Sequence, residues 1–255
     1  MRESRRGCAE IAVGKSGRVF LRAEWRDLVM LNYEVDPALL AKYVPRGTEL
    51  DAHRGKTYVS LVGFQFLRTR MFGFLPIPFH TNFDEVNLRF YVRRREGQAV
   101  KRGVVFIREI VPRRAIVMVA RRAYGENYTY RPMRHIVRRD AETIEARYEW
   151  RSGGKWGGLR VEAEGDAKLP VGGSAEQFIT EHYWGYAAQP DDGCVEYEVK
   201  HEPWRVWNCT SAAFDGGAAD LYGEALASVV LREPDSSFLA EGSEVQVLAG
   251  ASLPR

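Results

Sequence analysis

The sequence predicts an α+β protein made mainly of antiparallel strands. Aromatic residues form 12% of the chain, including 12 Tyr and 6 Trp, and such side chains favour strands and pocket walls. Residues 104–111 are apolar at nearly every position, which is typical of a strand covered on both faces. Residues 85–92 alternate instead, with Val86, Leu88, Phe90 and Val92 on one face and Glu85, Asn87, Arg89 and Tyr91 on the other.

The first half of the chain contains several further elements. Residues 19–30 favour a strand or a short turn, and Asp36-Pro37 is a helix start with Asp36 as N-cap. That helix ends at Val44-Pro45, because a residue before proline avoids the α conformation. The other elements expected here are a strand at 56–67, in which Gly63 marks a bulge or a close backbone approach, a long aromatic loop at 68–80, and a helix at 112–123 ended by Gly125.

The second half of the chain contains signals for a hairpin and for the start of a helix. A Gly-rich turn between residues 143–150 and 158–163 predicts a hairpin, and Ser174 with Gln177 fits a capping box at a helix start. The sequence then predicts two strands, a helix and a closing strand, at 194–201, 204–209, 221–231 and 244–250.

The chain shows no internal repeat and no linker. We therefore expect one domain at residues 19–255, preceded by a flexible N-terminal tail at residues 1–18. No stretch approaches the roughly 20 apolar residues of a membrane helix or resembles a signal peptide, so a soluble, cytoplasmic protein is expected. The three cysteines are scattered, which favours free thiols over a disulfide framework.

Positive charge is concentrated between residues 89 and 139, where 15 Lys and Arg face three acids although the whole chain carries only +3. Such a stretch can bind nucleic acid or another anionic partner. Here the charges come mostly as pairs at the ends of predicted elements, which is typical of solvated turns. No nucleic-acid recognition motif accompanies them, so a nucleic-acid partner is not expected.

Signatures of common catalytic sites are missing from the sequence. There is no GxSxG nucleophile motif and no metalloprotease HExxH motif. His80 and His182 could each bind a metal or move a proton, since imidazole titrates near pH 6.5, but a lone histidine beside aromatic residues more often has a structural role. We expect no metal and no cofactor.

Glu85 is the most informative polar residue, because it lies in mid-strand beside apolar neighbours. A buried carboxylate must be paired or protonated, and the candidate partners are Arg26, Arg89 and Arg108. Both a structural ion pair inside a barrel and a catalytic or ligand-binding role are open from the residues alone.

Six segments of the chain are informative together, namely FLRAEWRDLVMLNYEVDPALLAKYVP, EVNLRFYV, RGVVFIREIVPRRA, FITEHYWGY, HEPWRVW and AEGS. They resemble the bacterial family DUF2071, whose uncharacterised proteins are grouped with the acetoacetate decarboxylase-like superfamily. The resemblance covers nearly the whole chain after residue 18. It implies a mainly antiparallel β cone or barrel, with a few peripheral helices and a central polar pocket.

The decarboxylases themselves are a more distant comparison. Their helix before the pocket is similar to PALLAKYVP, and this alignment implies that Arg26 takes the place of their pocket arginine. Glu85 similarly takes the place of their pocket glutamate, whereas Tyr128 and Thr129 occupy the place of their lysine pair. Neither Tyr nor Thr can form an imine, so lysine-dependent decarboxylation is not expected.

These features predict a small-molecule pocket protein and leave open whether it is an enzyme. As an enzyme, it would act on a small carboxylate or carbonyl compound without a Schiff-base lysine. Arg26 would bind an anionic group, Glu85 would accept a proton, and Tyr128 or Tyr124 would donate a hydrogen bond to a developing oxyanion. Asn87 and Arg108 would support these groups. The alternative is a non-enzymatic ligand-binding or structural β-barrel protein, and the sequence leaves open whether the chain forms a homo-oligomer.

Overall fold

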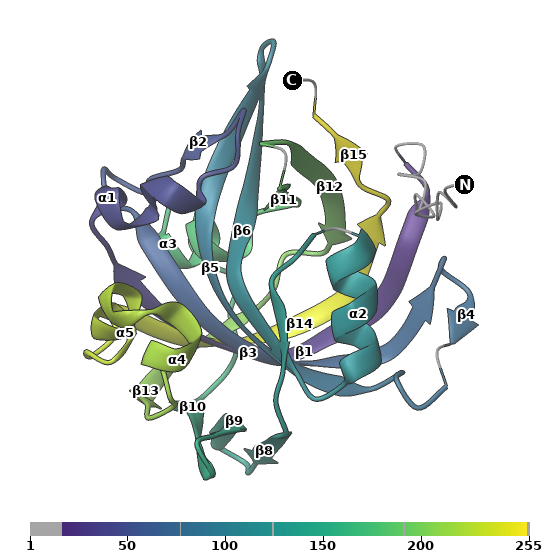
Figure 1. Ribbon diagram of the computed structural model, residues 1–255. Helices are drawn as coiled ribbons and strands as arrows, with labels where there is room; N and C mark the ends of the chain where they lie inside the picture. Colours follow the sequence, from purple (N-terminus) through teal and green to yellow (C-terminus); the bar gives the residue numbers. More distant parts are fainter. Residues whose placement is uncertain (1–16, 77, 124, 191, 254–255) are drawn as a thin grey trace.

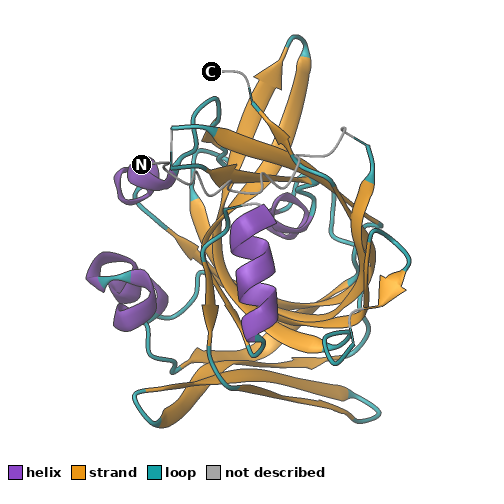
Figure 2. Ribbon diagram, turned by 45° about the vertical axis from the view of Figure 1, so that its right-hand side comes forward, coloured by secondary structure: helices purple, strands orange, loops and turns teal. Residues whose placement is uncertain are grey.

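The computed structural model describes residues 17–76, 78–123, 125–190 and 192–253. Its centre is a β-barrel (Figures 1 and 2), which closes where β12 pairs with β14. The predicted mainly antiparallel β fold is confirmed. In order around the barrel, the strands are β12 (Cys194–His201), β11 (Trp184–Ala188), β6 (Ala99–Val111), β5 (Phe83–Glu96), β3 (Tyr58–Met71), β1 (Val19–Glu34) and β14 (Ser236–Leu248).

An outer layer of strands packs against the barrel below β1 and β3 (Figure 1). It consists of β8 (Met133–Arg139), β9 (Thr143–Ser152), β10 (Lys155–Glu164) and β13 (Val206–Phe214). The predicted hairpin is the β9–β10 pair, whereas β8 was not predicted. One apolar core lies inside the barrel and a second lies between its wall and this layer. Gly63 allows the close approach predicted for it, since a Cβ there would lie 2.9 Å from the Tyr148 ring.

The helices are short, and α2 lies across the open end of the barrel (Figure 2). Phe178 and Ile179 of α3 belong to the apolar core inside the barrel. Asp36 and Ser174 cap helices as predicted, accepting hydrogen bonds from the backbone of Ala38 and Gln177. The expected helix at 221–231 is divided by Gly223, which has a φ of 77°. The helices are α1 (Pro37–Leu40), η1 (Ala41–Tyr43), α2 (Arg114–Ala123), α3 (Ala175–Thr180), α4 (Ala219–Tyr222) and α5 (Glu224–Val230).

Four short strands complete the fold, namely β2 (Glu49–Leu50), β4 (Leu75–Pro76), β7 (Tyr128–Tyr130) and β15 (Ala251–Ser252). Most of the tail expected at residues 1–18 lies outside the described residues, as does Cys8, while Cys194 and Cys209 are free thiols. None of the helices in the described part of the chain is long and apolar enough to cross a membrane.

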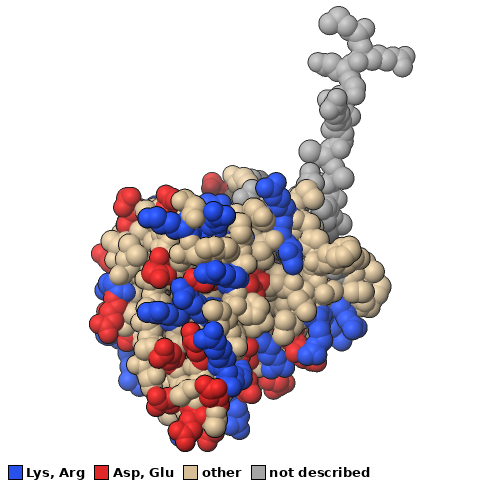
Figure 3. All heavy atoms as spheres, turned by 90° about the horizontal axis from the view of Figure 1, so that it is seen from below, with Lys and Arg blue, Asp and Glu red and all other residues tan. Residues whose placement is uncertain are grey.

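The fold neutralises much of the basic stretch between residues 89 and 139. Arg94 and Lys101 both pair with Glu196, at 3.2 and 2.8 Å, and Arg102 pairs with Asp51 at 2.6 Å. The acids come from other parts of the chain, so the charge imbalance along the sequence is not an imbalance in space. Figure 3 shows Lys and Arg interspersed with Asp and Glu on the face seen from below.

Candidate functional site

A cavity of about 370 Å³ lies inside the barrel, within the range of roughly 300–1,000 Å³ that is typical of small-molecule sites. Side chains of α2, including Ile116 and Val119, line it at the open end of the barrel. Its walls are mainly apolar and aromatic, and include Trp25, Phe64, Phe66, Phe83, Val104, Phe106 and Trp204. Such walls suit a ligand with an apolar body.

The polar groups of the cavity begin with a row on β5. Glu85, Asn87 and Arg89 line it together, because alternate residues of a strand point to the same face. Their exposed fractions are 2%, 2% and 7%. The predicted alternation is therefore confirmed, and the polar face of this strand points into the barrel.

Glu85 is held by two hydrogen bonds. Asn87 Nδ2 donates to Oε1 and Tyr128 Oη donates to Oε2, both at 3.0 Å. Burial raises the pKa of Glu85 to about 7, although these two hydrogen bonds and the charge of Arg89 act in the lowering direction. The carboxyl group is thus able to gain or lose a proton near neutral pH.

Two further glutamates line the same cavity. Glu109 lies on β6 opposite Asn87 and beside Tyr128 of β7, and Glu126 accepts a hydrogen bond of 2.9 Å from Tyr197 Oη. Burial raises the pKa of Glu126 to about 8 and raises the pKa of Glu109 well above its usual range. The charges of neighbouring carboxylates shift both pKa values further in the same direction. Three buried carboxyl groups therefore share one cavity.

Among the described residues that line the cavity, Arg89 is the one arginine. Its Nε is buried without a hydrogen-bond partner in that part of the chain. None of the ion pairs found between described residues includes Arg89. Its charge acts on His182 and His201, which also line the cavity. Burial, aided by that charge, lowers the pKa of both imidazoles to about 4, so Arg89 is the lasting positive charge near them.

A model of the family DUF2071, described as an uncharacterized conserved protein, matches residues 22–244. The chain belongs to the family DUF2071. The uncharacterized protein YqjF of Bacillus subtilis (strain 168) is 26% identical over 206 residues, which cover 80% of this chain and 81% of YqjF. The family resemblance seen in the sequence is confirmed.

Solved structures share the fold of this DUF2071 protein. Acetoacetate decarboxylase from Legionella pneumophila superposes with a TM-score of 0.62 at 13% identity, covering 96% of this chain and 90% of that one. The enduracididine biosynthesis enzyme MppR complexed with pyruvate gives 0.63 at 15% identity, with 96% and 93% covered. At such low identity these matches establish the acetoacetate decarboxylase-like fold and nothing about chemistry.

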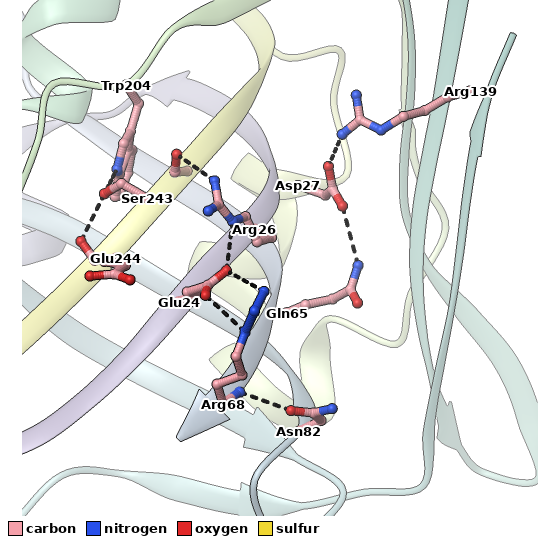
Figure 4. Close-up of polar contacts among 11 residues, drawn as sticks. Glu24, Arg26, Asp27, Gln65, Arg68, Asn82, Arg139, Trp204, Ser243 and Glu244 are labelled. Atoms are coloured by element: carbon pink, nitrogen blue, oxygen red, sulfur yellow. Dashed lines mark hydrogen bonds and ion pairs between the residues drawn. The ribbon is translucent and has the colours of Figure 1, made fainter. Parts of the chain in front are cut away.

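Arg26 does not line the cavity of this DUF2071 protein, so the expectation that it shares a pocket with Glu85 is wrong. Instead its Nε donates to Glu24 at 3.2 Å and its Nη1 donates to the backbone oxygen of Gly242 at 3.3 Å (Figure 4). Trp25 faces the cavity, so the next residue, Arg26, lies on the outer face of β1. A β-bulge follows between Arg26 and Val29, with Asp27 in the left-handed region at a φ of 54°.

The bulge changes which residues of β1 face inward. Trp25 lines the cavity before it and Leu28 lines the cavity after it, so the two-residue alternation is interrupted between them. The extra residue brings Leu28 to the face of Trp25, while Arg26 stays on the face of Glu24. Trp25, and not Arg26, therefore contributes to the cavity wall from this part of β1.

Arg108 also lies outside the cavity, for the same kind of reason. The β5–β6 register shifts so that Leu88 pairs with Arg108 but Arg89 pairs with Phe106. Phe106 and Glu109 consequently both line the cavity, while Arg108 donates to the backbone oxygen of Leu221 at 3.1 Å on the outer side. The prediction that Arg108 and Glu109 point to opposite faces is confirmed, whereas a supporting role for Arg108 in the pocket is wrong.

The other sequence-based candidates have mixed outcomes. Tyr128 reaches Glu85 as expected, while the neighbouring Thr129 accepts a hydrogen bond from Arg108 on the outer side. Tyr124 lies outside the described residues. His80 and His182 line the cavity, but no three metal-binding side chains in the described part of the chain are arranged to hold a metal ion.

Sequence reasoning missed two of the three glutamates. Glu109 could have been found, because it is a carboxylate inside an apolar strand, which is the argument already applied to Glu85. Glu126 and its partner Tyr197 carry no such signal, since one lies in a polar segment and the other is one of 12 tyrosines.

Proposed function

We propose that this protein binds a small carboxylic acid or carbonyl compound with an apolar body and catalyses proton transfer at the carbon beside the carbonyl group. The observation that carries the proposal is the shared placement of Glu85 and Arg89, both buried on the inner face of β5 and lining one cavity. Two buried groups of opposite charge that do not pair with each other suit a ligand that contacts both.

Arg89 is suited to bind the acidic end of the ligand. Its buried guanidinium has an unpartnered Nε among the described residues, and a carboxylate can accept two parallel hydrogen bonds from such a group. Because the surrounding walls are apolar, the attraction is screened less than it would be in water.

Glu85 is suited to take the proton. With a pKa near 7, a substantial fraction of the group is ionised at neutral pH and can act as a general base. Its carboxylate would remove a proton from the carbon, whose electron pair forms the C=C bond of an enolate as the carbonyl oxygen becomes negative. The Oη–H of Tyr128, which donates to Glu85 before the transfer, could then donate to that oxygen.

Return of the proton to the same carbon or to a neighbouring one completes the reaction without loss of atoms. The described residues that line the cavity include no lysine, and Tyr128 stands in the strand segment that the decarboxylase comparison had assigned to lysine. Proton transfer needs no covalent bond to the protein. Pyruvate in the MppR structure lends support to a small oxo acid as the ligand class for this fold.

Deuterium exchange tests the proposal directly. The protein is incubated in D2O with 4-phenyl-2-oxobutanoate, an oxo acid with an aromatic body, and loss of the proton signal beside the carbonyl is followed by NMR. Thermal unfolding with and without the compound measures binding. We expect exchange above the buffer rate and a ligand-dependent rise in melting temperature.

Arg89→Ala and Arg26→Ala form a matched pair for the same measurements. Arg89→Ala should weaken ligand binding by about 10- to 100-fold, the range for a lost charged hydrogen bond. Arg26→Ala should leave binding unchanged, since Arg26 is outside the cavity. Equal effects of the two variants would contradict the assignment, and Arg89-dependent binding without exchange would identify a ligand-binding protein instead of an enzyme.

A further inference from the structure

We propose that the ligand carries a cationic group in addition to its anionic one, and that Glu109 and Glu126 bind this cation while Arg89 binds the anion. An ammonium or amidinium group on a small carboxylic acid fits this description. The inference rests on the proposed function, because it takes Arg89 as the group that binds the acidic end.

The charges that line the cavity do not balance. Among the described residues that line the cavity, three are glutamates, one is an arginine and three are histidines. Burial keeps two of these histidines, His182 and His201, neutral at neutral pH. Arg89 can compensate one carboxylate at most. The other two carboxyl groups must either hold their protons or meet a positive charge from outside the chain, because an isolated buried carboxylate is strongly destabilised.

Unpartnered acceptors point to the same region. Glu109 Oε2 and Asn87 Oδ1 are buried without hydrogen-bond partners among the described residues, on side chains that are each 2% exposed and line the cavity. The two residues are directly opposite each other on β5 and β6. An ammonium group has three N–H donors and no acceptor, so it complements a site with a surplus of acceptors.

The two charged groups of the ligand would be bound in different parts of the cavity. The charge of Arg89 acts on Glu85, His182 and His201, whereas Glu109 is influenced by Tyr128 and the neighbouring carboxyl groups. Asn87 separates Glu85 from Arg89 along β5 and is opposite Glu109. The charge of Glu85 acts on both Glu109 and Glu126, so Glu85 belongs to the acid-rich part of the cavity.

Aromatic side chains add to the attraction for a cation. Tyr128 and Tyr197, which contact Glu85 and Glu126, both line the cavity together with Phe106 and Trp184. The negative face of an aromatic ring attracts ammonium groups, more strongly where water is excluded. The acid-rich part of the cavity is therefore suited to a cation on two independent grounds.

Three compounds on one frame test the inference. 4-(Aminomethyl)benzoate carries both charges at opposite ends of a benzene ring, 4-methylbenzoate lacks the ammonium, and 4-methylbenzylamine lacks the carboxylate. Affinities are measured by isothermal titration calorimetry. The compound with both charges should bind at least about 10-fold more tightly than either partner, as expected for one added charged hydrogen bond.

A matched pair of variants assigns the two parts of the cavity. Glu109→Gln should lower the affinity for 4-(aminomethyl)benzoate to that of 4-methylbenzoate, without changing the affinity for 4-methylbenzoate itself. Arg89→Met should have the opposite pattern and spare 4-methylbenzylamine. Circular dichroism checks that both variants fold, and Glu126→Gln replaces Glu109→Gln if the latter does not.

Proton release provides a readout in the unaltered protein. Calorimetry in phosphate and in Tris, which differ in ionisation enthalpy, counts the protons exchanged on binding. Binding of 4-methylbenzylamine should release protons, because the cation replaces those on the glutamates, and binding of 4-methylbenzoate should release none.

The outcomes separate this inference from the proposed function. Equal affinity for 4-(aminomethyl)benzoate and 4-methylbenzoate, with loss of both on Arg89→Met, overturns the cation site and leaves the anion site standing. Binding of the amine without proton release and without dependence on Glu109 or Glu126 overturns it as well. Binding of the amine alone supports the cation site and overturns the role of Arg89, while binding of none of the three at millimolar concentration contradicts both proposals.

Discussion

Arginine and glutamate occur together on both sides of the barrel wall, in two different states. On the outer side of β1, Glu24 pairs with Arg26 at 3.2 Å and with Arg68 at 2.9 Å (Figure 4), and the arginine side chains are 35% and 67% exposed. On the inner side of β5, Glu85 and Arg89 are almost completely buried and form no ion pair with each other. The outer charges compensate one another through ion pairs, whereas the inner charges do not pair with each other.

The difference has an energetic origin. Exposed ion pairs are screened by water and contribute about 1 kcal/mol or less each, so the outer group neither costs nor stabilises much. A buried charge without a partner costs several kcal/mol, and a protein that retains one needs a reason beyond folding. The presence of an Arg and a Glu is therefore not enough to indicate a binding site. A site is indicated where the two groups are buried and do not pair with each other.

The largest effect is expected from removing the proposed base. Glu85→Gln keeps the shape of the side chain but cannot accept the proton, so deuterium exchange of 4-phenyl-2-oxobutanoate should fall by about 10²- to 10⁴-fold. Glu24→Gln is the matched control from the outer group and should leave the rate unchanged. NMR on both variants makes the comparison, and equal loss in the two would show that Glu85 acts only through stability.

A smaller effect is expected from Tyr128→Phe. In the unaltered protein, the hydrogen bond from Tyr128 lowers the pKa of Glu85. The variant lacks this bond, so the pKa of Glu85 and the pH midpoint of exchange should move upward from about 7. The rate should fall by about 10-fold, the value of one hydrogen bond to a charged group. Tyr130→Phe, two residues further along β7 and outside the cavity lining, serves as the control, and an unchanged pH profile for Tyr128→Phe would contradict the contact.

The regular parts of the fold could be predicted from sequence. The alternation from Glu85 to Val92 placed Glu85, Asn87 and Arg89 on one face, and the structure confirms it because β5 has no extra residue of its own in this stretch. The caps at Asp36 and Ser174 were predicted for a similar reason, since a cap depends on a few adjacent residues. Local rules hold where the backbone remains regular.

The errors arose where a bulge interrupts the alternation. Arg26 and Arg108 were both placed in the pocket, and each lies beside a register shift. The shift near Phe106 turns Arg108 outward and Glu109 inward, whereas Arg26 already faces outward beside Trp25, directly before the bulge on β1. No propensity marks Asp27 as a left-handed residue strongly enough to predict its bulge, because Asp tolerates that conformation but rarely requires it. A displacement of one residue therefore changed the chemistry assigned to the cavity.

The bulge on β1 can be tested through the strand beside it. Gly242, which pairs with Arg26, has a φ of 80°, and a Cβ there would lie 1.9 Å from the backbone oxygen of Trp25. Gly242→Ala should destabilise the protein by roughly 2–3 kcal/mol through strain and overlap. Urea unfolding measures the free energy, and ligand-induced stabilisation should also decline because Trp25 forms part of the cavity wall.

Gly153→Ala is the matched control for Gly242→Ala. Gly153 also has a positive φ, 56°, but a Cβ there would meet no atom within 4 Å, so only the conformational cost of about 1 kcal/mol should appear. The excess destabilisation of Gly242→Ala over Gly153→Ala measures the close approach at the bulge. Equal values for the two variants would mean that β1 and β14 can separate there at no cost.

The smallest effect is a pH dependence that distinguishes buried from exposed carboxyl groups. Burial raises the pKa of Glu126 from 4.5 to about 8, so the folded state holds a proton that the unfolded chain releases. The resulting stability is fully present below pH 4.5 and is lost as the pH rises through about 8, by about 1 kcal/mol per pH unit for one group. Glu126→Gln should therefore reduce the decline of unfolding free energy between pH 6 and 8, as measured by urea unfolding across roughly that range.

Glu49→Gln provides the opposite case. Hydrogen bonds from Arg93 and Arg95 lower the pKa of this exposed carboxyl group, so its contribution is present above its usual pKa and is lost only in acid. The variant should follow the unaltered protein throughout the neutral and alkaline range, because the group is ionised there in both states. If Glu126→Gln showed the same profile as the unaltered protein, the proton on Glu126 would be absent, and the cavity would already contain a cation that compensates its charge.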